Sequence, residues 1–80
     1  MENYVIHFTC GNNIEKIYGP YTSKEKAKDA IKVQANAIKN EIQYIELIEE
    51  SNFRYDKMIL RDKKTKIDAC IFKLFKTENF

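Results

Sequence analysis

The feature that most constrains the fold is a single stretch of helical spacing set between segments of strand spacing. Between Ala27 and Ile38, apolar residues recur every three or four positions, which places them on one face of an α-helix. On either side of this stretch, apolar residues alternate with polar ones, as is typical of half-buried β-strands. One helix and several strands bury each other economically as two packed layers. The chain is therefore predicted to form an α+β domain.

The first two strands are expected to form a hairpin. Residues 3–10 alternate in polarity and are rich in β-branched and aromatic side chains. Residues 11–13 are Gly-Asn-Asn, and these residue types tolerate the positive φ angles of tight turns. Residues 14–18 read as the return strand. This strand is expected to end at Gly19-Pro20, because proline cannot extend a hydrogen-bonded ladder.

The helix has a clear start signal. Thr22 fits the N-cap of a capping box completed by Glu25, and Ser23 is the alternative cap. We expect the helix to end near Lys39-Asn40, where Asn can adopt the left-handed cap conformation. Val33 lies out of phase with the core face. That face is rich in alanine, which favours close packing on a sheet, and it comprises Ala27, Ala30, Ile31, Gln34, Ala35 and Ile38.

Three further strands are predicted after the helix, over residues 41–50, 53–61 and 66–76. Polar residues at 51–52 and 62–65 form the connecting turns, and residues 77–80 are expected to fray. The last strand carries apolar residues on both faces, which is typical of a central or dimer-facing strand. The predicted order is ββαβββ, with one helix on an antiparallel sheet, in one domain spanning residues 1–80.

The chain length limits what such a domain can do. Eighty residues bury only roughly 60–65% of their unfolded surface, which leaves little room for a pocket of ~300 Å³. No apolar run approaches the ~18 residues of a membrane span, and the first residues lack the basic start and apolar stretch of a signal peptide. Cys10 and Cys70 are expected to be reduced in a cytoplasmic protein, although a disulfide is arithmetically possible.

The sequence offers little for catalysis. The one histidine, His7, and Cys10 are expected on opposite faces of a strand, so neither a zinc site nor a nucleophile–base pair is indicated. No glycine-rich phosphate loop is present. We therefore expect no enzyme, no metal and no cofactor. The carboxylates that acid–base chemistry would use lack an evident cleft, and they are Glu41, Glu46, Glu49, Glu50 and Asp68.

Charge is distributed unevenly along the chain, and this favours a binding function. Residues 41–52 carry a net charge of −4, whereas residues 53–80 carry +4. Glu46 is expected to pair across strands with Lys57 or Lys73. Tyrosine is favoured at interfaces, and an exposed strand edge can pair with a partner or with a second copy, so a homodimer is also open. The predicted protein-binding residues are Tyr18, Tyr21, Glu46, Glu49 and Glu50, whereas Tyr4 and Tyr44 are expected in the core.

Nucleic-acid binding is the alternative function. Lysine contacts phosphate without reading sequence, and the chain has lysines at one predicted hairpin tip and along one helix flank. Only two arginines are present and the isoelectric point is about 8.5, both low for a nucleic-acid-binding domain. The candidate residues are Arg61, Lys63, Lys64 and Lys66 at the tip, and Lys28, Lys32 and Lys39 on the helix.

No motif identifies a family, but the whole chain resembles the small orphan proteins of bacteriophages and other mobile elements. The resemblance lies in its size, its richness in Ile, Lys and Asn, and its compact α+β pattern without catalytic residues. Some of those proteins, including anti-CRISPR proteins, block a host nuclease by docking on it. The resemblance implies steric occlusion of a larger host protein, with the acidic segment from Glu41 to Glu50 as a possible mimic of nucleic-acid phosphates.

Overall fold

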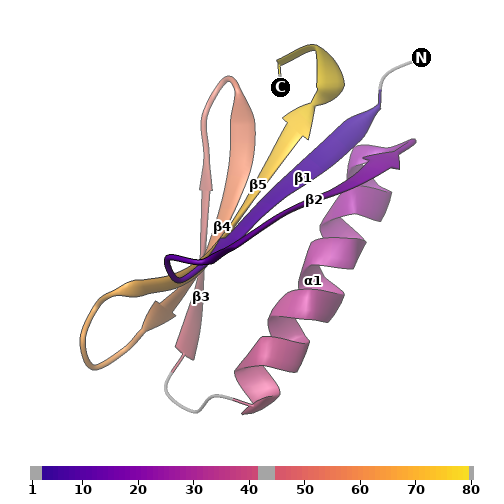
Figure 1. Ribbon diagram of the computed structural model, residues 1–80. Coiled ribbons are helices and arrows are strands. Elements are labelled where there is room, and N and C mark those ends of the chain that lie inside the picture. Colours follow the sequence, from indigo (N-terminus) through magenta and orange to yellow (C-terminus); the bar gives the residue numbers. More distant parts are fainter. Residues whose placement is uncertain (1–2, 42–44, 80) are drawn as a thin grey trace.

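The computed structural model describes residues 3–41 and 45–79 and has the predicted element order. Figure 1 shows one helix lying against a twisted five-stranded sheet. The α+β fold class is therefore confirmed. Within the described ranges, no helix is both long and apolar enough to cross a membrane. The elements are β1 (Tyr4–Cys10), β2 (Ile14–Tyr21), α1 (Lys24–Glu41), β3 (Ile45–Ser51), β4 (Tyr55–Asp62), β5 (Asp68–Lys76) and the short 3₁₀ helix η1 (Thr77–Asn79).

The sheet is antiparallel throughout and has the strand order β2-β1-β5-β4-β3. The two edge strands, β2 and β3, are those that α1 connects, so the helix crosses from one edge of the sheet to the other (Figure 1). β5 occupies the centre, between β1 and β4. Its apolar residues on both faces are thus explained by a central position, as predicted.

The core lies between α1 and one face of the sheet. Ala27, Ile31 and Ala35 are at most 1% exposed, and the small alanines let the helix backbone approach the strands. All six residues of the predicted stripe are buried or half-buried, and Val33 is 70% exposed, as its phase predicts. The sheet residues beneath the helix are Ile6, Phe8, Ile45, Met58, Leu60, Cys70, Phe72 and Leu74.

The ends of α1 differ in detail from the prediction. The Ser23 hydroxyl accepts a hydrogen bond from the Lys26 backbone N–H at 3.1 Å, so Ser23, and not Thr22, caps the helix. At the other end the helix continues past Lys39-Asn40 to Glu41. The predicted strand over residues 41–50 is therefore wrong at Glu41, which is helical, and β3 is described from Ile45. The remaining residues of that stretch, including Tyr44, lie outside the described residues.

β2 does not stop at Gly19-Pro20, contrary to the prediction. It continues to Tyr21, with a cis peptide bond between Gly19 and Pro20. Proline is tolerated here because β2 is an edge strand, where a missing N–H can face solvent. Gly19 has a φ of 126°, and a Cβ atom there would lie 3.0 Å from the Tyr4 carbonyl oxygen. A bulge results, since Tyr18 and Tyr21, three residues apart, pair with Ile6 and Tyr4, which are two apart.

The connections after β3 are built by short polar side chains. The β3–β4 turn spans residues 52–54 and not the predicted 51–52, since β3 continues to Ser51 and β4 begins at Tyr55 and not at Phe53. The Asn52 side chain holds this turn by accepting hydrogen bonds from the N–H groups of Arg54 and Tyr55. Asp62 does the same for Lys64 and Thr65 in the β4–β5 turn. The Lys66 N–H donates to the Asp62 carbonyl oxygen, and the Asp62 N–H donates to that of Ile67. These bonds and a positive φ at Lys66 extend the turn, so β5 begins at Asp68 and not at Lys66 as predicted.

The chain after β5 does not simply fray. Thr77–Asn79 form η1, and the Thr77 N–H donates to the Asn3 carbonyl oxygen at 2.9 Å. This bond continues the β1–β5 ladder beyond Tyr4 and Lys76.

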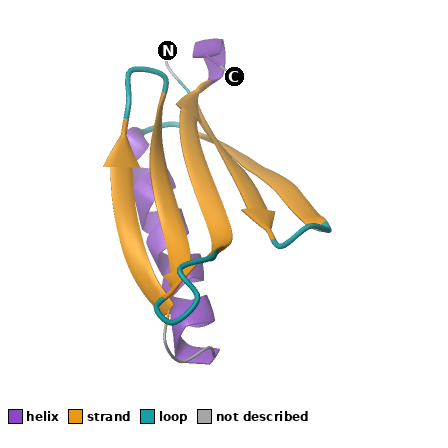
Figure 2. Ribbon diagram, turned by 90° about the vertical axis from the view of Figure 1, so that its left-hand side faces the viewer, coloured by secondary structure: helices purple, strands orange, loops and turns teal. Residues whose placement is uncertain are grey.

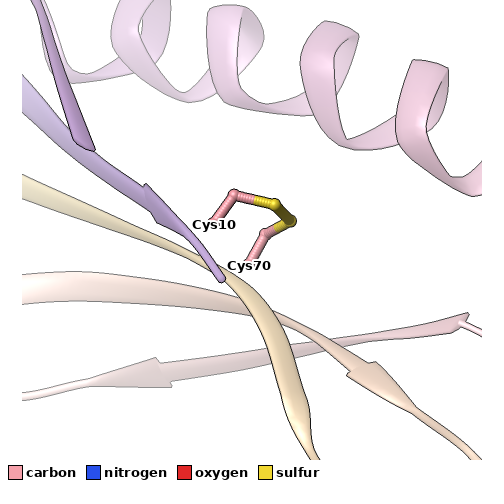
Figure 3. Close-up of a disulfide and its surroundings, with 2 residues drawn as sticks. All are labelled: Cys10 and Cys70. Carbon is pink, nitrogen blue, oxygen red and sulfur yellow. A yellow bond between two sulfur atoms is a disulfide. The ribbon is translucent and has the colours of Figure 1, made fainter. Parts of the chain in front are cut away.

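The cysteines form a disulfide, which corrects the expectation of two reduced thiols. Cys10 of β1 and Cys70 of β5 are direct partners in the antiparallel ladder, with their Cα atoms 4.1 Å apart. Figure 3 shows both side chains extending from the sheet toward α1. The sequence separation of 60 positions gave no hint of pairing, because only the strand register brings the two cysteines face to face.

Candidate binding surface

The face of the sheet opposite α1 has no second layer of described residues over it. Figure 2 shows the helix along one side of the strands and the other side bare. We call this side the uncovered face. Strand alternation and register assign to it Val5, His7 and Thr9 of β1, Glu15 and Ile17 of β2, Glu46, Ile48 and Glu50 of β3, Tyr55, Lys57, Ile59 and Arg61 of β4, and Ile71, Lys73 and Phe75 of β5.

The centre of the uncovered face is apolar. Ile48, Ile59 and Ile71 lie side by side on β3, β4 and β5. Ile59 is only 1% exposed, whereas its two neighbours are half-buried. Isoleucines in adjacent strands cover one another by cross-strand packing, so this row forms a small apolar patch without help from the helix.

An aromatic pair lies four residues further along β4 and β5. The rings of Tyr55 and Phe75 are 4.9 Å apart between centroids, and both side chains are half-buried. The Lys73 ammonium lies 5.3 Å from the Tyr55 ring centroid, within the range of a cation–π contact. Tyr55 thus contacts both an aromatic ring and a cation.

Charges of both signs separate and border these apolar groups. One row across the sheet reads Glu50, Lys57, Lys73 and His7, with the His7 Nε2 atom 2.9 Å from the Glu15 carboxylate. His7 and Cys10 face opposite sides of β1, as predicted. The face is therefore amphipathic and carries no dominant sign.

Glu46 lies opposite Arg61 in the register. The predicted pairing of Glu46 with Lys57 or Lys73 is therefore wrong. Arg61 Nε donates to the Asp68 carboxylate at 2.7 Å, and this hydrogen bond raises the pKa of the Arg61 guanidinium. Glu50, not Glu46, is the residue opposite Lys57.

The predicted binding tyrosines lie on the other side of the sheet. Tyr18 and Tyr21 are half-buried and pack against the core, with the Tyr18 ring 6.4 Å from that of Phe8. Their expected exposure is wrong because the bulge at Gly19-Pro20 turns both side chains toward the helix. Tyr4 also packs against the core, as expected.

The predicted acidic surface is divided. Glu46 and Glu50 belong to the uncovered face, whereas Glu49 lies opposite Met58 on the helix side, where it is exposed. Glu41 is the last residue of α1. The four carboxylates thus do not form the single phosphate-like row that the resemblance suggested.

The candidate nucleic-acid-binding lysines are not gathered into one patch. Lys28 lies 3.7 Å from Asp56, six residues, or about 20 Å of strand, before the β4–β5 turn begins at Asp62. That turn holds Lys63, Lys64 and Lys66, and Figure 1 shows it at the lower left, away from α1. Lys32 and Lys39 are exposed along the helix.

Asp56 joins the start of α1 to the sheet. Its side chain is 15% exposed, and its carboxylate lies 2.8 Å from the Lys24 ammonium. Burial raises the pKa of Asp56, but hydrogen bonds from Lys24 and Ser51, together with the charges of Lys24 and Lys28, outweigh it, so the pKa lies below its usual value. The same hydrogen bond raises the pKa of Lys24. The Lys24–Asp56 ion pair supports the fold, and the same carboxylate also pairs with Lys28.

The residues that sequence analysis missed are the apolar and aromatic ones on the uncovered face. Their alternation was visible in the sequence, since Tyr55, Lys57 and Ile59 fall on one side of a strand and Ile71, Lys73 and Phe75 on one side of another. Which side the helix would cover was not visible.

Comparisons with protein-family models, with curated proteins and with solved structures found no match.

Proposed function

We propose that this chain is a non-enzymatic binding module that docks on a larger protein through its uncovered face. The observation that supports the proposal is the bare sheet surface itself, which carries the isoleucine row and the Tyr55–Phe75 pair between charges of both signs. An apolar centre with a polar border is the composition of protein interfaces. Aromatic residues often supply much of their binding energy.

The charges favour a protein over a nucleic acid as the partner. Glu46 and Glu50 stand beside Lys57 and Arg61, so a phosphate backbone laid on this face would meet carboxylates as well as cations. Arg61 is already bonded to Asp68. Nucleic-acid binding draws most of its affinity from a concentration of positive charge, which this face lacks.

The partner surface that fits has a defined chemistry. It presents an apolar patch to Ile48, Ile71 and Phe75, with acidic side chains facing Lys57 and Lys73 and a basic one facing Glu50. A module without a catalytic site acts on such a partner by covering it. Steric blocking of a host protein, as in inhibitors from mobile elements, is the form of this function that we propose.

The test compares two variants with the same change in charge. The partner is first captured from a lysate of the source cells with the wild-type chain, and its affinity is then measured with purified protein. K57Q/K73Q should weaken binding at least about tenfold, since both lysines lie on the docking face. K32Q/K39Q, on the exposed side of α1, should bind as the wild type does.

Three results would contradict the proposal. Equal affinities of the two variants would place the interface elsewhere. A concentration-dependent homodimer that buries this face would make the partner a second copy. Binding to DNA or RNA near 50 mM salt that weakens log-linearly with salt, and that K63E/K64E abolishes, would support the nucleic-acid alternative.

A further inference from the structure

The β1–β2 hairpin gives the sheet an edge that stands clear of the helix. β2 is the edge strand, and Figure 2 shows this hairpin projecting at the lower right, away from α1. The first four residues of β2 are exposed, with Ile14 at 48% and Ile17 at 58%. We propose that two copies of this chain pair along β2 in antiparallel orientation and form one continuous sheet.

The backbone of β2 offers hydrogen-bonding groups to such a neighbour. At the end of β1, the Gly11 N–H donates to a carbonyl oxygen of β5 at 3.0 Å. Because successive residues of a strand direct their backbone groups to opposite sides, Phe8 directs its N–H and C=O toward β2, where it lies opposite Lys16. Glu15 and Ile17, which flank Lys16, therefore direct their N–H and C=O groups away from the sheet.

Charge favours self-pairing at β2 over self-pairing at the other edge. Between Ile14 and Tyr21, β2 carries one acidic and one basic residue, Glu15 and Lys16, so its charges cancel. β3 carries three glutamates and no basic residue. Two copies joined along β3 would bring like charges together across the junction, and like charges on neighbouring strands are destabilising.

The register of the pairing follows from symmetry. A twofold axis places the central residue of the junction opposite its own copy. Centres at Glu15 or Lys16 would set like charges opposite each other, whereas a centre at Ile17 sets two exposed isoleucines in contact. In that register Lys16 lies opposite Tyr18 of the second copy, and Glu15 lies opposite Gly19 of the second copy. The Ile17 N–H of each copy then donates to the Ile17 carbonyl oxygen of the other.

The junction is short, which sets the kind of dimer expected. The bulge at Gly19 and the missing N–H of Pro20 end the regular part of the edge. We therefore expect a dimer that dissociates on dilution. The inference does not depend on the proposed docking function, because edge pairing leaves the uncovered face of each copy open and sets the two faces side by side.

The test is sedimentation equilibrium of the purified chain over a wide range of concentrations. The apparent mass should rise with concentration from the 9.5 kDa of one chain toward twice that value. An apparent mass that stays at one chain at every concentration would overturn the proposal.

Proline substitutions locate the junction, because they can remove an outward N–H without breaking the bonds within the sheet. I17P should weaken self-association at least about tenfold, since it removes the central pair of hydrogen bonds. E49P is the matched control on β3. The Asn52 N–H donates to β4, so Glu49, three residues earlier, directs its N–H outward from the other edge, and E49P should change self-association less than about twofold.

A second pair of variants serves if I17P loses the circular dichroism of the folded chain. I17K places a lysine opposite its own copy and should also weaken self-association at least about tenfold, whereas V33K adds the same charge to the exposed side of α1 and should not. Equal effects of both members of a pair, or a dimer that E49P breaks and I17P leaves intact, would overturn the proposal.

Discussion

The central strand β5 shows the contrast between the two faces of the sheet within one segment. Toward α1 it presents Cys70, Phe72 and Leu74, all at most 3% exposed. Away from α1 it presents Ile71, Lys73 and Phe75, all half-buried and mixed in character. The same backbone therefore serves a closed core on one side and an open, amphipathic surface on the other.

On the proposed function, this difference separates the residues that stabilise the fold from those that bind a partner. The covered face excludes water through a helix whose alanines lie close to the strands, so substitutions there remove buried contacts directly. The uncovered face has charged side chains next to its isoleucines and aromatic residues, so it is compatible with water. Its apolar area is what the proposed partner would bury. Substitutions there should affect binding more than folding.

The largest expected effect comes from paired substitutions in β5. Phe72→Ala removes a ring that is 1% exposed, and we expect the free energy of unfolding to fall by about 3–5 kcal/mol. Phe75→Ala removes the same ring from the half-buried face, where a loss of about 1–2 kcal/mol is expected. Urea denaturation followed by circular dichroism measures both. If Phe72→Ala does not fold, Phe72→Leu and Phe75→Leu supply the comparison, with a loss of about 1 kcal/mol at Phe72 and a smaller one at Phe75. Equal losses in the two positions would contradict the contrast.

The next largest effect concerns the disulfide beneath α1. Reduction releases a constraint that joins residues 60 positions apart, and we expect it to lower the free energy of unfolding by about 2–4 kcal/mol. Thermal unfolding with and without dithiothreitol measures the change, and the C10A/C70A variant should not respond to the reductant. Two free thiols by mass spectrometry in the oxidised preparation would show that the bond does not form.

Acid should weaken the contact between α1 and the sheet. The pKa of Asp56 is lower in the folded state than its ordinary value of 3.8, so its contribution is present above that value and is lost as the pH falls through the folded value. Asp56→Asn should therefore lower the free energy of unfolding by about 1 kcal/mol at pH 7. Below about pH 4, the free energy of unfolding of this variant should depend less steeply on pH than that of the wild type. Denaturation curves between pH 2.5 and 7 test this, and parallel curves for both proteins would contradict it.

The helix cap gives a matched test at adjacent residues. Ser23→Ala removes the bond to the Lys26 N–H and should cost about 1 kcal/mol. Thr22→Ala should cost less than half as much, because the Thr22 hydroxyl is 3.4 Å from the flexible Lys26 ammonium and satisfies no helix N–H. Thermal unfolding compares them, and the reverse order would restore Thr22 as the cap.

The smallest expected effect on stability lies on the uncovered face. K57Q/K73Q removes two cations and one cation–π contact with Tyr55, and we expect a change below about 1 kcal/mol. The same variant is the one expected to lose partner binding. A loss of several kcal/mol in its denaturation curve would mean that these lysines serve the fold.

Much of the fold could be predicted because the spacing of apolar residues reports directly on local structure. The helix stripe from Ala27 to Ile38 and the central position of the last strand both followed from the spacing of apolar residues alone. The helix start was ambiguous because Thr22 and Ser23 are both capable caps. The path of β2 was missed because the rule against proline in a ladder depends on whether the strand is at an edge, which is a property of the whole sheet.

The proposed binding surface was harder to predict because it depends on pairings between distant segments. Tyr18 and Tyr21 would point to opposite sides of a regular strand, and the bulge between them brings both to the core. The match of Cys10 with Cys70 depends on the β1–β5 register. The isoleucine row depends on both the β3–β4 and the β4–β5 register. Alternation of polarity within a single strand carries no information about either register.

The most direct test of the division between the faces uses the isoleucine side chains as reporters. Methyl-labelled isoleucine spectra of the chain, recorded free and with the captured partner, follow both faces in one experiment. Binding should shift or broaden the methyl signals of Ile17, Ile48 and Ile71 and leave in place those of Ile6 and Ile31, which lie in the core between the sheet and α1. Signals of Ile48 and Ile71 that stay unchanged in the saturated complex would contradict the account.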